Sequence, residues 1–259
     1  MKLEIRGLQK VFTNNRRGNL LVLDGVDLEF ASGEFVSIVG PSGCGKSTLL
    51  QLIAGLERLT SGHISVDGRS LNGPGLDRGI VFQEYALFPW QTVQKNVEFG
   101  PRVRGLTKKE RRLISEKYIE LTGLQGFESY YPGELSGGMR QRIALARALA
   151  NEPEILLMDE PFAALDAQLR EALQQEVLQI WEQTRKTIVF VTHQIEEAIF
   201  LAQRVVVMTA RPGRVKEIVN LDLPRPRCRE TRISPEFHKA ESRIRKLVWE
   251  EVSGQDRSE

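Results

Sequence analysis

The segment Gly40-Pro-Ser-Gly-Cys-Gly-Lys-Ser-Thr48 constrains this chain more than any other. It fits the pattern G-x-x-x-x-G-K-S/T, follows an apolar run that ends at Val39, and precedes apolar residues at helical spacing. Glycines let backbone N–H groups turn toward an anion, and a helix N-terminus adds positive charge there. Lys46 supplies a charge for the β- and γ-phosphates, and Ser47 a hydroxyl for Mg²⁺. We therefore expect a strand, a phosphate-binding loop and a helix, rather than an ordinary Gly-rich turn. The expected contact residues are Gly40, Pro41, Ser42, Gly43, Cys44, Gly45, Lys46, Ser47 and Thr48.

A second apolar run, Ile155 to Met158, ends in Asp159 and Glu160. This pattern predicts a buried strand with two carboxylates at its carboxyl end, where open α/β sheets bind ligands. Asp159 is a candidate for holding Mg²⁺ through water, and Glu160 for polarising an attacking water. A solvated acidic turn is the better interpretation of this run alone, but the phosphate loop favours the catalytic one.

A third signal is the sequence Leu-Ser-Gly-Gly-Met-Arg-Gln-Arg, which contains Ser136, Gly137 and Gly138. Ser136 is the predicted N-cap of a helix, because apolar residues at helical spacing follow it. Such a helix start is either a second anion-binding surface or an ordinary capped helix. The residues alone leave both interpretations open.

Strand and helix patterns alternate along the rest of the chain, which predicts an α/β fold with a largely parallel sheet. A helical and polar stretch at about residues 90–150 interrupts the strand pattern and predicts a helical subdomain. Apolar residues at helical spacing near the end predict a C-terminal amphipathic helix, and we place a domain boundary at 224/225. The expected strands are Leu3–Ile5, Val22–Phe30, Phe35–Val39, His63–Val66, Gly79–Phe82, Ile155–Met158, Ile188–Thr192, Val205–Met208 and Val215–Val219.

Composition and charge exclude several classes of protein. The longest run without a charged residue, Phe35 to Gly45, is far shorter than the ~20 residues that cross a bilayer. Residues 1–6 show no secretory signal, so we expect a cytosolic protein. Lys plus Arg number 36 and Asp plus Glu 34, and this near balance argues against nucleic acid as a partner. The two cysteines, Cys44 and Cys228, are too few for a disulfide framework or a four-ligand zinc site.

The order of these motifs resembles that of the ATPase subunits of ABC transporters, over about residues 1–220. The resemblance implies a P-loop (RecA-like) core, an antiparallel β subdomain and an α-helical subdomain. It also implies ATP and Mg²⁺ as cofactors and a head-to-tail homodimer in which the phosphate loop faces Ser136, Gly137 and Gly138 of the other copy.

The resemblance assigns roles to four further residues. Gln83 matches a glutamine that contacts Mg²⁺ or the attacking water and couples to the membrane partner. Asp166 matches a residue at the dimer interface, and His193 a histidine at the γ-phosphate. Phe12 matches an aromatic residue that stacks on adenine, although a position in the core is the alternative.

A narrower resemblance, to nitrate, sulfonate and taurine importers, rests on Pro89-Trp90 and on Ala210-Arg-Pro-Gly-Arg214. It implies permease subunits, a solute-binding protein outside the cell, and a peripheral position on the cytoplasmic face of the membrane. The aromatic segment Tyr85–Trp90 is then a docking surface for the permease, or alternatively a packed internal loop. Residues 211–232 carry a local charge of 7 − 3 = +4, which suits an anionic lipid surface or membrane partner, or simply a solvated face.

The sequence as a whole therefore predicts the ATPase subunit of an importer for small anions. The alternative is a soluble ABC ATPase that acts on nucleic acid or the ribosome. It is disfavoured because the chain has one phosphate loop and no long heptad run. A nucleotide kinase or GTPase is disfavoured because no N-K-x-D motif occurs.

Overall fold

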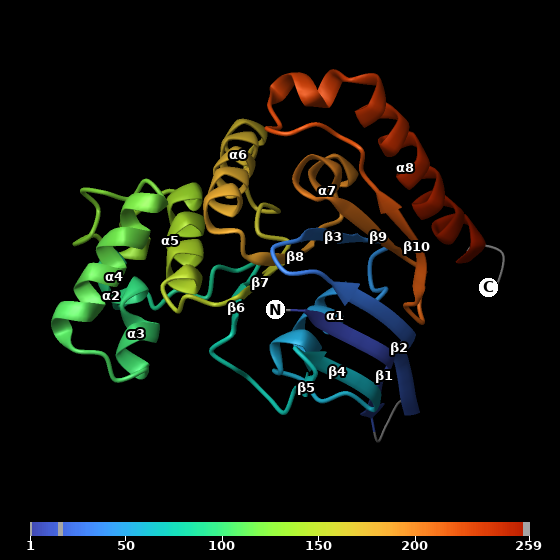
Figure 1. Cartoon of the computed structure of the whole chain (residues 1–259), viewed down its shortest axis with the longest axis horizontal. Helices are drawn as coiled ribbons and strands as arrows, with labels where there is room; N and C mark the ends of the chain where they lie inside the picture. The colour runs from blue at the N-terminus through green and yellow to red at the C-terminus, as the bar shows by residue number, and fades with distance from the viewer. Residues whose placement is uncertain (1, 15–17, 256–259) are drawn as a thin grey trace. The chain divides into compact units, whose positions relative to one another are not determined.

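The computed structural model describes residues 2–14 and 18–255. The chain forms two compact units, and the second is inserted into the sequence of the first (Figure 1). The first unit consists of Met1–Gly75 and Thr187–Glu259, and the second of Leu76–Lys186. Each unit is described by itself below.

The first unit contains an antiparallel sheet with the strand order β2-β1-β4-β5. Its strands are β1 Leu3–Asn14, β2 Gly18–Phe30, β4 Ser61–Val66 and β5 Arg69–Ser70. β1 pairs with β2 from Leu3↔Phe30 to Asn14↔Gly18, with three shifts of register on the way. The structure therefore has the predicted antiparallel sheet, but its first strand is much longer than the predicted one, which ended at Ile5.

The first unit also contains the strands β10-β9-β3-β8, in that order. They are β3 Phe35–Val39, β8 Thr187–Val191, β9 Arg204–Met208 and β10 Val215–Asn220. β3 runs parallel to β8 and β9, whereas β10 is antiparallel to β9. All five residues of β3 and of β8 are buried, as is usual for parallel strands covered on both faces.

Helices pack on these strands. α1 (Lys46–Ala54) contacts β8, and α7 (Ile195–Leu201) packs on β3 and β9. The long helix α8 (Pro235–Gln255) runs beside β9 and β10 and also contacts α7 (Figure 1). Phe237 and Ile244 of α8 are fully buried, so the predicted amphipathic helix is present and packs on its own unit.

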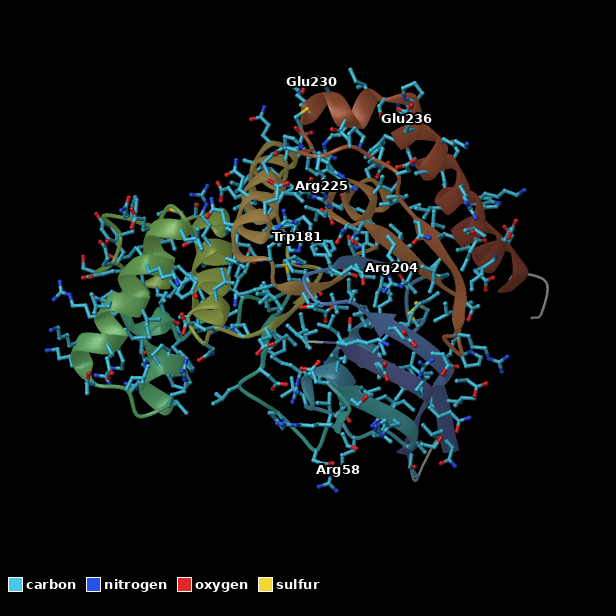
Figure 2. All side chains as sticks on the ribbon, viewed as in Figure 1. Arg58, Trp181, Arg204, Arg225, Glu230 and Glu236 are labelled. Carbon is cyan, nitrogen blue, oxygen red and sulfur yellow. The ribbon has the colours of Figure 1, made fainter. Side chains whose placement is uncertain are left out.

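The basic segment after β10 makes contacts within its own unit. The guanidinium of Arg227 is buried and donates to the carbonyls of Ile199, Phe200 and Ala202 at 2.7, 2.9 and 2.6 Å. Arg225, labelled in Figure 2, donates to the carbonyl of Leu201 at 3.1 Å. These carbonyls lie at the C-terminus of α7, where the helix leaves acceptors unpaired and favours positive charge. The expectation that this segment meets a lipid surface or solvent is therefore wrong for Arg227, which is buried, whereas Arg225 is half-buried.

The second unit contains two parallel strands and a group of helices. Its elements are β6 Arg78–Val81, β7 Ile155–Asp159, α2 Val93–Val97, α3 Phe99–Val103, α4 Lys108–Leu121, α5 Gly137–Leu149 and α6 Ala167–Thr184. β6 pairs with β7 from Arg78↔Ile155 to Val81↔Met158. α4 begins with a capping box in which Thr107 and Glu110 exchange hydrogen bonds, which explains its sharp start. Helices fill most of 90–150, where the sequence predicts them.

Candidate nucleotide-binding site

The phosphate loop of the first unit connects β3 to α1, as the sequence predicts. Gly45 occupies the N-cap of α1 with φ +100°, a conformation that L side chains rarely adopt. A Cβ on Gly45 would lie 2.7 Å from Cδ2 of Leu23, so only glycine fits here. The N-cap Gly45 makes no side-chain capping hydrogen bond, and the first-turn N–H groups of a helix have no partner within the helix itself. This is the geometry that an anion needs at a helix N-terminus.

Lys46 lies inside this loop, with only 6% of the residue exposed. Its Nζ donates to the carbonyls of Gly40 and Pro41 at 2.8 and 3.0 Å. These two carbonyl acceptors hold the ammonium inside the loop. Ser47, the next residue of α1, is exposed.

Cys44 is another buried residue of the loop, with 1% exposure. Burial raises the pKa of its thiol, although the nearby ammonium of Lys46 acts in the opposite direction. The buried Cys44 side chain fills space inside the loop.

His193 lies at the same sheet edge as the phosphate loop. Because Ile38 pairs with Val191, both Gly40 and His193 come two residues after this pair. Thr192 fixes the turn by donating to the carboxylate of Glu197 at 2.6 Å. The side chain of His193 is exposed, so the structure places it beside the loop and leaves it accessible.

Phe12 lies on β1 of the first unit, and 37% of the residue is exposed. The ammonium of Lys10 lies 4.4 Å from the centre of its ring. Lys10 is itself held by the carboxylate of Glu57 and the carbonyl of Arg58, at 2.9 and 2.7 Å. Phe12 is therefore a partly accessible ring rather than a core residue.

The second unit brings Gln83, Asp159 and Glu160 to one sheet edge. Val81 pairs with Met158 in the parallel ladder, so Gln83 and Glu160 both come two residues after this pair. Asp159 and Glu160 are half-buried, and Gln83 is exposed. Glu160 has φ +44°, a strained conformation for a residue with a side chain, and such strain is typical of functional sites.

Two helix N-termini of the second unit carry the remaining predicted residues. Ser136 caps α5 by accepting the N–H of Met139 at 3.3 Å, which confirms the predicted cap. Gly137 and Gly138 form the first turn of α5. Asp166 caps α6 by accepting the N–H of Leu169 at 3.0 Å, a contact that the sequence analysis did not predict.

The loop after Gln83 is also strained. Tyr85 and Ala86 both have positive φ, +55° and +48°. Arg147 of α5 donates to their carbonyls at 2.9 and 2.5 Å, and burial lowers the pKa of this guanidinium. No sequence pattern marked Arg147, because its partners lie 61 and 62 residues away.

Within the described ranges, no helix combines the length and the apolar character needed to cross a bilayer.

Residues 23–163 match the family model of the ABC transporter. The solved ATP-binding cassette MJ0796, a dimer bound to ADP and Pi, superposes with a TM-score of 0.74 at 34% identity, covering 85% of this chain and 98% of that one. The predicted α/β fold with a P-loop core is thereby confirmed.

Two named relatives match almost end to end. The nitrate import ATP-binding protein NrtD of Synechocystis sp. is 48% identical over 254 residues, or 96% of this chain and 95% of the relative. The aliphatic sulfonates import ATP-binding protein SsuB of Bacillus cereus is 43% identical over 239 residues, or 92% and 94%. The chain therefore belongs to the ABC transporter family as an ATP-binding subunit, a class that hydrolyses ATP.

Proposed function

We propose that this chain is the ATPase subunit of an importer for small anions of the nitrate, sulfonate or taurine type. The ammonium of Lys46, held inside a glycine loop at the N-terminus of α1, is the observation that carries the ATP-binding part. The importer part is supported by the near full-length similarity to two proteins named for nitrate and sulfonate import.

We assign the chemistry to residues at the two sheet edges. Glu160 polarises the attacking water, Gln83 orients it, and His193 contacts the γ-phosphate. The hydroxyl of Ser47, the amide oxygen of Gln83 and the carboxylate of Asp159 are hard oxygen donors, which suit Mg²⁺. Mg²⁺, when bound there, would neutralise charge on the β- and γ-phosphates.

In the proposed cycle, two copies of the chain bind two ATP molecules head to tail. Phe12 stacks on adenine, and the phosphate loop of one copy faces Ser136, Gly137 and Gly138 of the other. The exposed position of Ser136 at the N-terminus of α5 supports this assignment, because helix N-termini bind phosphate groups. Asp166 lies at the same interface, where its contact with α6 holds the turn in place.

Permease subunits are the proposed membrane partners, and Tyr85–Trp90 is the proposed docking segment. The support is that 70% of Trp90 is exposed, although Phe88 beside it packs against Phe99 with ring centres 4.5 Å apart. Within this segment Phe88 thus packs internally, whereas Trp90 is accessible. A solute-binding protein outside the cell completes the proposed complex, and the subunit lies on the cytoplasmic face of the membrane.

The test is transport in cells that lack the gene. Growth on nitrate, taurine or alkanesulfonates as the sole nitrogen or sulfur source should fail for one of these solutes. Wild-type protein should restore growth, whereas the Lys46→Ala variant should not. Growth on all of these solutes without the gene would refute the import function. A soluble ABC ATPase acting on nucleic acid or ribosomes would instead show ATPase activity stimulated by those partners.

A further inference from the structure

The turn between β9 and β10 contacts the phosphate loop directly. Arg211, in this turn, donates from Nε and Nη2 to the carbonyl oxygen of Gly43 at 3.2 and 3.1 Å. Gly43 lies in the middle of the loop and has φ +75°. The turn is the Ala-Arg-Pro-Gly-Arg motif noted in the sequence, to which the proposed function assigns no role.

The contact fixes the orientation of one peptide group of the loop. The Gly43–Cys44 peptide is trans, so its carbonyl and its N–H point in opposite directions. Arg211 binds the carbonyl on one side, and on the other the N–H of Cys44 is directed to the carbonyl of Pro41 at 3.3 Å. The same carbonyl of Pro41 accepts a hydrogen bond from Lys46. A cation on the carbonyl side therefore keeps this N–H directed to the side of the loop that holds Lys46.

The turn is also attached to β2 by hydrogen bonds and an ion pair. Gly213 approaches the loop so closely that a Cβ would lie 2.0 Å from the carbonyl oxygen of Cys44. Its own N–H donates to Val22 of β2 at 2.8 Å, and its carbonyl accepts from Asp24 at 3.1 Å. Arg214 adds an ion pair with Asp24.

A second anchor comes from α8. The N–H of Ala210, next to Arg211, donates to the carboxylate of Glu251 at 3.1 Å. Glu251 is in turn paired with Lys216 of β10 at 2.8 Å. The turn is thus held from β2 on one side and from the C-terminal helix on the other.

We propose that Arg211 is a positioning residue of the nucleotide site, which holds the phosphate loop in the conformation that binds the phosphates. This inference rests on the proposed ATP-binding role of the loop. In the proposed function the loop binds the phosphates equally in the ground state and in the transition state. Arg211 therefore contributes to nucleotide affinity and little to kcat. An arginine that merely packs on the surface would affect neither.

The experiment compares Arg211→Ala, Arg211→Lys and a matched control, Arg69→Ala, in the full-length subunit. Arg69 is an exposed arginine of β5 in the same unit. For Arg211→Ala we expect the Kd for ATP and ADP and the KM for ATP to rise about tenfold, which equals about 1.4 kcal/mol. We expect kcat to change less than about twofold and Arg211→Lys to recover part of the affinity, because a single ammonium still reaches a carbonyl.

A second measurement reads the loop itself. The buried Cys44 should react faster with a thiol reagent in Arg211→Ala, while the exposed Cys228 serves as an internal reference. Unchanged nucleotide affinity in Arg211→Ala would overturn the proposal, as would a loss of kcat without a change in KM. Equal losses in Arg211→Ala and Arg69→Ala would overturn it too. If the wild-type protein binds no ATP, the proposed function itself fails, which is a distinct result.

Discussion

The side-chain amide of Asn96 forms two hydrogen bonds with the backbone of Phe88. Its Oδ1 accepts the N–H of Phe88 at 2.9 Å, and its Nδ2 donates to the carbonyl of Phe88 at 3.1 Å. The same Nδ2 lies within hydrogen-bond distance of the carbonyls of Gln91 and Thr92, at 3.0 and 3.1 Å. Asn96 is completely buried, so it determines the course of the segment that we propose as the docking surface.

We expect Asn96→Ala to lower the free energy of unfolding by about 2–3 kcal/mol, because it leaves buried backbone groups unpaired. Urea unfolding followed by circular dichroism measures this loss. Asn220→Ala, at an exposed position of β10, is the matched control and should change stability by less than about 0.5 kcal/mol. Equal stability of the two variants would contradict the role given to Asn96.

Trp90 and Phe88 should respond differently to replacement by alanine. Trp90→Ala should leave stability nearly unchanged and weaken co-purification with the permease, because most of the ring is exposed and accessible to a partner. Phe88→Ala should instead cost about 3 kcal/mol of stability, since it removes the ring packed on Phe99. Full assembly with Trp90→Ala would rule out this ring as an anchor.

Lys46→Ala should lower the affinity for ATP on the order of a hundredfold, because it removes the buried ammonium of the loop. Isothermal titration calorimetry with ATP measures the change. Lys109→Ala, at an exposed position of α4, should bind ATP like the wild type. An undiminished affinity in Lys46→Ala would defeat the assignment of the loop.

Glu160→Gln separates binding from chemistry. The amide keeps the size of the side chain but cannot polarise water as a carboxylate does, so we expect kcat to fall at least about a hundredfold. ATP binding should remain, and a dimer should accumulate during gel filtration with MgATP. Glu171→Gln, at an exposed position of α6, is the control. Normal turnover in Glu160→Gln would exclude this carboxylate from catalysis.

Asp24 should make stability depend on pH. Hydrogen bonds from Gln9 and then from Arg214 lower the pKa of Asp24. A carboxyl with a lowered pKa stabilises the folded state above its unfolded pKa, and this contribution disappears as the pH falls through the folded value. Asp24→Asn should therefore be less stable than the wild type at pH 7, and the difference should shrink below about pH 4. Thermal unfolding across this range would show a constant difference if the contacts were irrelevant.

The sequence predicted those parts of the site that depend on local backbone chemistry. The end of β3 at Val39, Gly45 at the start of α1 and the cap by Ser136 are set by neighbouring residues. These features recur wherever the same short sequence pattern occurs. The spacing of the residues in the pattern was therefore sufficient to predict them.

Contacts between distant parts of the sequence could not be predicted in this way. Arg211 and Gly43 are 168 residues apart, and no sequence pattern around either residue predicts their contact. The continuation of β1 to Asn14 likewise depends on pairing with β2 and not on its own composition. For the same reason the net positive charge of residues 211–232 did not predict that Arg227 donates to a carbonyl at the C-terminus of α7.

The contacts of Arg225 and Arg227 attach the segment after β10 to the C-terminus of α7. A shortened protein that stops before Arg225 would lack both guanidinium groups that bind the last carbonyls of α7. It would also uncover the apolar surface of α7 that contacts α8. Because α7 begins two residues after His193, we expect fraying of this helix to disturb the turn that carries His193, the residue proposed to contact the γ-phosphate. We therefore expect a protein truncated before Arg225 to be less stable, even though it keeps every proposed nucleotide-binding motif.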